Sequence, residues 1–259
     1  MYRFMTFNLR INVSSDGSNS WPYRYHSVSR LIRDQKPLVV GTQEVLLSMQ
    51  EDLKPQLPDY TFFGVPRKPN EESNTIIYNH HLLDLVTGGT FWLSETPSKP
   101  FSSNPDSACV RICTWAEFKL KRPPHQSFRV FNTHLDHISQ RARINGISII
   151  FDKIKYHQNL ETLPTILMGD FNDTPSSDTL LEINRYDHLA IYPTKTTVPP
   201  LKEDSIATYH GFNGPIQGEP IDYIFLTKDI KCLHYAILTD QINGQDPSDH
   251  YPVIVDVRF

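Results

Sequence analysis

The sequence has few cysteines, and their spacing fits neither a disulfide framework nor a zinc site. Three cysteines, Cys109, Cys113 and Cys232, occur in 259 residues. Their number is odd, and they form no CxxC pair or Cys/His cluster at zinc spacing. The sequence therefore predicts neither a disulfide scaffold nor structural zinc.

Long apolar runs and a strong excess of one charge are also missing. No apolar stretch approaches the ~20 residues that span a bilayer, and no signal-peptide pattern opens the chain, so we expect a cytoplasmic protein without a membrane span. Twenty-five Lys and Arg against 29 Asp and Glu leave a formal net charge of −4. Duplex DNA binding needs cations along a whole face, and the densest cluster is only Lys119, Lys121 and Arg122, so such binding is disfavoured.

Hydrophobic residues make up 39% of the chain and charged residues 21%, which excludes a disordered chain. Apolar segments of strand length alternate with helical patterns, which predicts one mixed α/β domain over residues 1–259. A helix is expected from about residue 22 to 33, and another around Ile147, Ile150, Phe151 and Ile154, which share one helical face. We expect strands at 2–9, 38–42, 60–65, 75–79, 110–119, 128–134, 165–168, 221–226 and 252–257. Antiparallel pairing is expected in the middle of the chain, and a long functional or mobile loop at 192–220.

Polar residues follow or begin several of these predicted strands. Strand ends in a layered α/β domain converge on one edge, where side chains distant in sequence can meet. Each residue also has an ordinary interpretation: Glu44 as a charge at a helix start, Asp170 and Asn172 as turn residues, and His134 as a core histidine. Asp222 is harder to dismiss, because an acid within an apolar strand needs a partner or a metal.

The motifs that carry these residues also occur in a characteristic order. They are Thr6-Phe-Asn8, Gln43-Glu44, Asn132-Thr-His134-Leu, Gly169-Asp-Phe-Asn172, Asp222-Tyr and Ser248-Asp-His250. In type and order they resemble the core motifs of the endonuclease/exonuclease/phosphatase superfamily, the deoxyribonuclease I-like proteins, across nearly the whole chain. The resemblance implies an α/β (α+β) fold, a four-layered sandwich of two packed mixed β-sheets flanked by helices.

The resemblance further implies a metal site. Glu44 is expected to be the principal Mg²⁺ ligand, with Asn8 and Asp249 placing the ion directly or through water, and Mn²⁺ as a possible substitute. Such a site suits Mg²⁺, a hard cation that binds one or two carboxylates and keeps several waters.

The catalytic residues are likewise implied by the resemblance. His250 and Asp222 are expected to form a dyad, and Asp170 to align or deprotonate the attacking water. Asn172 and His134 are expected to hold the non-bridging phosphate oxygens, with His134 as a cation or as the proton donor to the leaving group. The choice of general base between Asp170 and His250 stays open.

The implied reaction is in-line hydrolysis of a phosphodiester or phosphomonoester by a monomeric enzyme, on a small phosphoester or single-stranded nucleic acid. The alternatives are a 3′–5′ exoribonuclease of the deadenylase type and a non-catalytic binding protein on the same fold. The second is disfavoured, because clustered carboxylates repel one another without a metal.

Three further residues are expected to contact substrate. Arg24 or Arg111 is expected to supply a second phosphate contact, and Phe212 a wall of the leaving-group pocket. Asp136 is expected to act only indirectly, and His137 to lie in the first turn of a helix.

Overall fold

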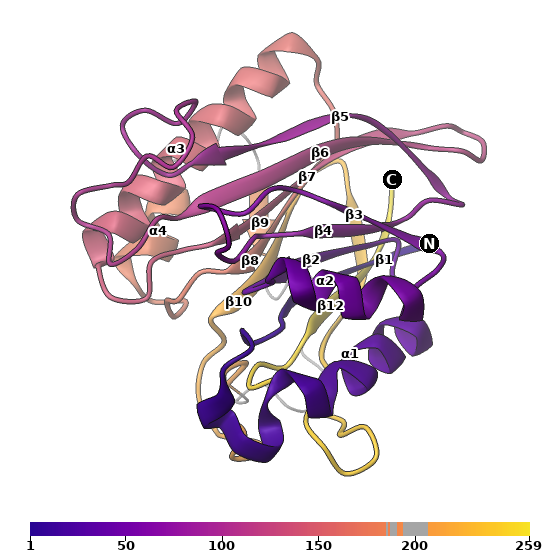
Figure 1. Cartoon of the computed structure of the whole chain (residues 1–259). Helices are drawn as coiled ribbons and strands as arrows, with labels where there is room; N and C mark the ends of the chain where they lie inside the picture. The colour runs from indigo at the N-terminus through magenta and orange to yellow at the C-terminus, as the bar shows by residue number, and fades with distance from the viewer. Residues whose placement is uncertain (185, 187–190, 194–206) are drawn as a thin grey trace.

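The computed structural model describes residues 1–184, 186, 191–193 and 207–259. These residues form two six-stranded sheets that pack face to face (Figure 1). The first sheet has the order β11(Lys231–Ile237)-β12(Val253–Arg258)-β1(Tyr2–Asn8)-β2(Val39–Gln43)-β4(Ile76–Asn79)-β3(Tyr60–Phe63). The second has the order β5(Leu83–Trp92)-β6(Ile112–Leu120)-β7(Ser127–His134)-β8(Thr165–Asp170)-β10(Asp222–Thr227)-β9(Ile191–Pro193).

Helices cover the outer face of each sheet. The helical segments are η1(Ser14–Asn19), α1(Trp21–Gln35), α2(Leu47–Leu53), η2(Lys54–Gln56), α3(Gln140–Leu160) and α4(Asp178–Asn184). Side chains of α1 and α2 pack on the first sheet, and those of α3 and α4 on the second. The two sheets with their helical layers form the α/β sandwich that the motifs imply.

Successive side chains along a strand point to opposite faces of the sheet. One set packs in the central core between the two sheets, and the other packs in an outer core between a sheet and its helices. Phe4 of β1 points between the sheets and packs against Phe128 of β7, with ring centroids 5.6 Å apart. Its neighbour Met5 points outward into the cluster beneath α1 and α2. Because a strand has a period of two, a run buried on both faces reads as continuously apolar.

Strand direction places the polar motifs at one edge. β1 pairs parallel to β2, with Asn8 opposite Gln43, and β7 pairs parallel to β8, with His134 opposite Asp170. β10 runs antiparallel to β8, so that it begins with Asp222 opposite Asp170. The chain termini lie at the other end of the sandwich, since Tyr2 pairs with Val257 (Figure 1).

Several expectations need correction. β5, β9 and β11 were not predicted, and all three are edge strands. β5 and β11 are mostly part-exposed, so their apolar pattern is weak. β9 covers the first two residues of the expected loop at 192–220. His137 precedes α3 and does not lie in its first turn, because Ser139 caps that helix by accepting a hydrogen bond from Ala142 N. Of the loop expected at 192–220, residues 194–206 lie outside the described residues.

Among the described residues, no helix is both long enough and apolar enough to cross a membrane.

Candidate active site

A pocket of about 510 Å³ opens at the edge where the polar motifs converge. It is bounded by the ends of β2, β7 and β8, by the segment before β12, and by loops around residues 67–72 and 109–111. Its lining residues are Arg10, Ile11, Glu44, Arg67, Glu72, Cys109, Arg111, His134, His137, Asp170, Asn172, Tyr209, Ile221, Asp249 and His250.

Asp170, Asp222 and His250 form a buried group at the site. His250 Nδ1 lies 3.0 Å from Asp222 Oδ2, and His250 Nε2 lies 3.8 Å from Asp170 Oδ2. Burial opposes a charge on His250, but Asp222 and then Asp170 outweigh it and raise the His250 pKa to about 10. Burial and the Asp222 charge raise the pKa of Asp170 to about 7. The neighbouring carboxylates therefore favour a charged His250 ring, and burial favours the protonated form of Asp170.

The motif Gly169-Asp-Phe-Asn172 begins with glycine for a steric reason. The φ of Gly169 is +150°, and a Cβ at this position would lie 2.0 Å from the carbonyl oxygen of Thr133 on β7. Only glycine fits a backbone that approaches its neighbour so closely. The register that sets His134 beside Asp170 therefore depends on Gly169.

Glu44 and Asp249 supply carboxylate oxygens at the same rim, and the buried Asn8 contacts Glu44. The Glu44 carboxylate accepts hydrogen bonds from Asn8 Nδ2 at 3.1 Å and from Ile11 N at 2.8 Å. Asn8 Nδ2 also donates to Asp170 Oδ2 at 3.0 Å, so Asn8 holds the two carboxylates in place. The pKa of Asp249 is raised by burial. Mg²⁺ binds hard oxygen ligands such as carboxylates, so Glu44 and Asp249 fit such an ion.

His134 and Asn172 also lie next to Asp170. His134 Nε2 is 3.5 Å from Asp170 Oδ2, and its buried Nδ1 has no hydrogen-bond partner within the described chain. Burial, followed by the charges of Arg111, His250 and Arg67, holds the His134 pKa well below its usual value. This favours a neutral ring, contrary to the expected cation. Asn172 is fixed by its own contacts: its backbone N–H donates to Asp170 Oδ1, and its Nδ2 donates to the Leu135 carbonyl.

Of the two arginines considered for phosphate contact, only Arg111 lines the pocket. Arg24 is completely buried, and its guanidinium donates to the backbone carbonyls of Leu9, Arg10, Asn19 and Pro247. Burial lowers the Arg24 pKa to about 10. All of its nitrogens are committed to loop carbonyls, so the expected phosphate contact of Arg24 is corrected to a structural role.

Phe212 also differs from its expected position. It does not line the pocket, and its ring lies 5.8 Å from the Arg24 guanidinium. The aromatic side chain on the pocket is Tyr209, whose ring centroid is 5.1 Å from that of His250.

The structure adds pocket residues that the sequence reasoning missed. Arg67 and Glu72 come from the loop between β3 and β4, and Cys109 precedes β6. Arg10 lies 3.7 Å from Asp249 Oδ2 and two residues after the first motif, which is a signal that could have been used. Arg67 and Glu71 are spaced i, i+4, which is common for charge pairs on exposed surfaces. The sequence of this loop therefore gives no sign that it borders a pocket.

Comparison with known proteins agrees with this geometry. The model of the Endonuclease/Exonuclease/phosphatase family matches residues 5–250. A mannosyl-6-phosphatase of Bacteroides thetaiotaomicron VPI-5482 is 30% identical and superposes with a TM-score of 0.92, covering 100% of both chains. An endonuclease/exonuclease/phosphatase from Bacteroides vulgatus is 32% identical, with a TM-score of 0.91 over 99% of this chain and 98% of its own.

A more distant solved structure shares the fold. D. rerio TDP2, solved with a single-strand DNA product, has a TM-score of 0.76 at 15% identity, over 100% of this chain and 99% of its own. No match is found among curated proteins.

Proposed function

The chain belongs to the endonuclease/exonuclease/phosphatase family, a family of phosphoric ester hydrolases, and on that premise we propose that it is a Mg²⁺-dependent phosphatase of small phosphomonoesters. The observation that carries the proposal is the buried Asp170–Asp222–His250 group. Two of its members, Asp170 and His250, line the same pocket as the carboxylates of Glu44 and Asp249. Water is the nucleophile, since in-line phosphoryl transfer needs positioning and charge stabilisation rather than a covalent intermediate.

Glu44 and Asp249 would hold the metal, with Asn8 fixing the Glu44 carboxylate. When bound, the ion supplies positive charge to a phosphate oxygen. Mn²⁺, with similar oxygen ligands, is expected to substitute.

The proton chemistry is assigned to Asp170. Its pKa of about 7 suits a base that takes the proton of the attacking water near neutral pH. His250, kept charged by Asp222, is assigned as a donor to a phosphate oxygen. This assignment chooses between the two candidate bases, because a group already protonated at neutral pH cannot act as the base there.

His134, Asn172 and Arg111 are assigned to the remaining phosphate oxygens. A neutral His134 donates a hydrogen bond from one ring nitrogen, and Arg111 provides the positive charge that the sequence reasoning had placed on His134. A monoester exposes one more charged oxygen than a diester, so two cationic side chains beside the phosphate favour monoesters.

Support for a monoester also comes from the similar solved structure that is named a mannosyl-6-phosphatase and aligns with the whole chain. Single-stranded nucleic acid, bound by the more distant D. rerio TDP2, is the second substrate class to test.

The test compares hydrolysis of p-nitrophenyl phosphate with that of bis(p-nitrophenyl) phosphate, with Mg²⁺, with Mn²⁺ and with EDTA. We expect metal-dependent cleavage with a higher kcat/KM for the monoester. A preference for the diester would favour the nuclease alternative, including the deadenylase type. Lack of turnover on both esters and on a panel of sugar phosphates and oligonucleotides would favour the binding protein.

A further inference from the structure

We propose that Glu72, held by Arg67 and beside Arg111, forms a subsite that binds hydroxyl groups of a polyhydroxylated leaving group. The proposal rests on the proposed phosphatase function and specifies the class of alcohol that is released. It concerns the wall formed by the pocket-lining residues of two loops, Arg67, Glu72, Cys109 and Arg111, and we call these four residues the Glu72 wall.

Glu72 is a buried carboxylate with one oxygen committed and one oxygen free. Its side chain lines the pocket, and the residue is only 8% exposed. Oε1 accepts a hydrogen bond from Arg67 Nη1 at 2.6 Å, and Oε2 has no hydrogen bond within the described part of the chain. Arg67 is itself held through Nε by Glu71 at 2.7 Å. The free Oε2 is therefore an acceptor on a fixed carboxylate.

Arg111 supplies donors beside this acceptor. It is 6% exposed, and its buried Nε and Nη1 have no hydrogen-bond partner in the part of the chain that the structure describes. Nη1 is 3.8 Å from Glu72 Oε1, and Nη2 is 3.0 Å from His137 Nδ1. Nε is likewise 3.8 Å from Asp136 Oδ2, so both nitrogens have ion-pair contacts but no hydrogen bond among the described residues. Arg111 therefore keeps unused hydrogen-bond donors beside Glu72, and buried donors are more stable when a partner satisfies them.

A hydroxyl group matches this arrangement better than an anion does. It can donate to Glu72 Oε2 and accept from Arg111 at the same time. A second phosphate or a carboxylate has only acceptors and would be repelled by Glu72. A nucleobase would use a stacking face, and the aromatic ring of the pocket, Tyr209, already packs against His250.

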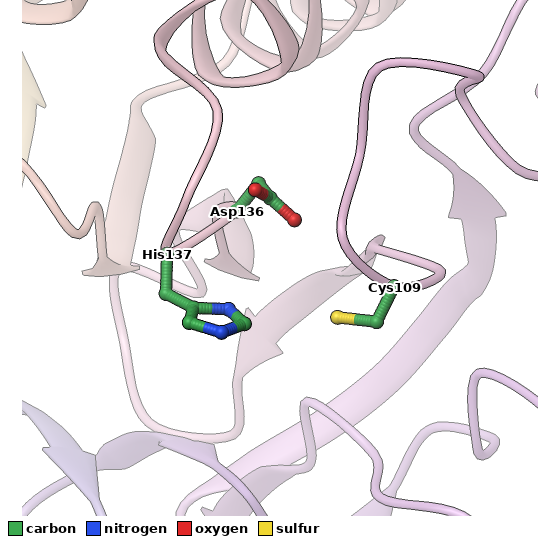
Figure 2. A group of neighbouring side chains, drawn as sticks. All are labelled: Cys109, Asp136 and His137. Carbon is green, nitrogen blue, oxygen red and sulfur yellow. The ribbon is translucent and has the colours of Figure 1, made fainter.

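The neighbouring trio of Cys109, Asp136 and His137 does not form a competing metal site. Figure 2 shows the His137 ring and the Cys109 thiol facing each other, with Asp136 beside them. Arg67 Nη1 lies 3.2 Å from the Cys109 sulfur, and Arg111 lies against both other residues. Asp136 also accepts from Ser107 and from the backbone N–H groups of residues 108, 138 and 139. Two guanidinium cations already neutralise this trio, which therefore orients Arg111.

The experiment compares Glu72→Gln with the matched control Glu71→Gln. The two residues are adjacent and both pair with Arg67, but only Glu72 lines the pocket. The substrates are mannose 6-phosphate and other hexose 6-phosphates, n-hexyl phosphate without hydroxyls, and p-nitrophenyl phosphate, each with Mg²⁺. Thermal unfolding of each variant checks that it folds.

We expect Glu72→Gln to lower the ratio of kcat/KM for the preferred hexose phosphate to that for p-nitrophenyl phosphate by ~10- to 100-fold, the effect of losing a hydrogen bond to a charged group. Glu71→Gln should change this ratio less than about 3-fold, as exposed ion pairs contribute little. An equal loss on all substrates, or an unchanged ratio, would overturn the proposal.

The wild-type enzyme gives a second measurement if Glu72→Gln does not fold. A hexose 6-phosphate should exceed n-hexyl phosphate in kcat/KM by ~10-fold or more, because a site with polar groups rejects a ligand that leaves them unpaired. Hydrolysis of n-hexyl phosphate as fast as the sugar phosphates would overturn the subsite but leave the phosphatase standing. Absence of ester hydrolysis with any metal would remove the proposed function itself, and the subsite with it.

Discussion

The two sides of the pocket are built differently. The side proposed to be catalytic, which we call the catalytic side, consists of Asp170, Asp222 and His250. These residues stand at or next to strand ends, and their charged atoms lie within 4.8 Å of one another. The Glu72 wall lies on loops and keeps donors and an acceptor without partners. Strands fixed by register hold reacting groups to small tolerances, whereas loops vary without disturbing the sheets. This difference suggests that the catalytic side determines the reaction and the wall determines the substrate.

The largest effect is expected on the catalytic side. His250→Ala should lower kcat by ~10²- to 10⁴-fold on every substrate, because it removes the imidazolium paired with Asp222. Steady-state kinetics on p-nitrophenyl phosphate and a hexose phosphate would measure it. His81→Ala, at an exposed histidine outside the pocket, is the control. A loss of kcat only on the sugar phosphate would show that His250 selects the substrate, as proposed for the Glu72 wall, and would contradict its role in the reaction.

Metal binding provides the next test. EDTA should abolish turnover, and Mg²⁺ or Mn²⁺ should restore it. Glu44→Gln should raise the Mg²⁺ concentration for half-maximal activity by ~10- to 100-fold or more, as loss of a carboxylate near a metal does. Titration of Mg²⁺ against activity measures the shift, and Glu51→Gln on α2 is the control. An unchanged Mg²⁺ requirement in Glu44→Gln would contradict the metal assignment.

The two buried arginines should respond in opposite ways. Arg111→Ala should lower kcat/KM by ~10- to 100-fold and should cost less stability than Arg24→Ala, because Nε and Nη1 of Arg111 make no hydrogen bond among the described residues and have only ion-pair contacts at 3.8 Å. Arg24→Ala should lower the free energy of unfolding by ~3 kcal/mol or more, because it leaves buried loop carbonyls unsatisfied. Denaturant unfolding and kinetics on both variants separate the effects. A large stability loss in Arg111→Ala would make it a structural residue like Arg24.

The smallest expected effect is a gain in stability. The Asp170 pKa is about 7 in the folded protein, above the ~3.9 of an unfolded chain, so its stabilising contribution is present below pH 4 and is lost as the pH rises through 7. Asp170→Asn avoids this loss and should raise Tm by a few degrees at pH 8 in EDTA, and by less at pH 4. Asp152→Asn, exposed on α3, is the control. A lower Tm at pH 8 would contradict the raised pKa.

The sequence predicted the catalytic side much better than the wall. Asn8, Glu44, His134, Asp170, Asp222 and His250 were found because their motifs occur at strand ends in family order. Arg67 and Glu72 were missed because charged residues in a polar loop are typical of any solvated surface. Arg24 was misassigned, since an arginine in an amphipathic helix gives no local sign that its guanidinium is buried among loop carbonyls.

The sequence by itself determined most of the strands, the glycine at position 169, and the order of the polar motifs. These depend on the period of two along a strand and on the backbone freedom of single residues, both of which are local. Only the tertiary structure places Asp222 beside His250, which raises the His250 pKa, and buries His134, which lowers the His134 pKa. It also brings Glu72 and Arg111 to one pocket. Burial and charge act through space between segments distant along the chain, so these properties exist only once the two sheets have packed together.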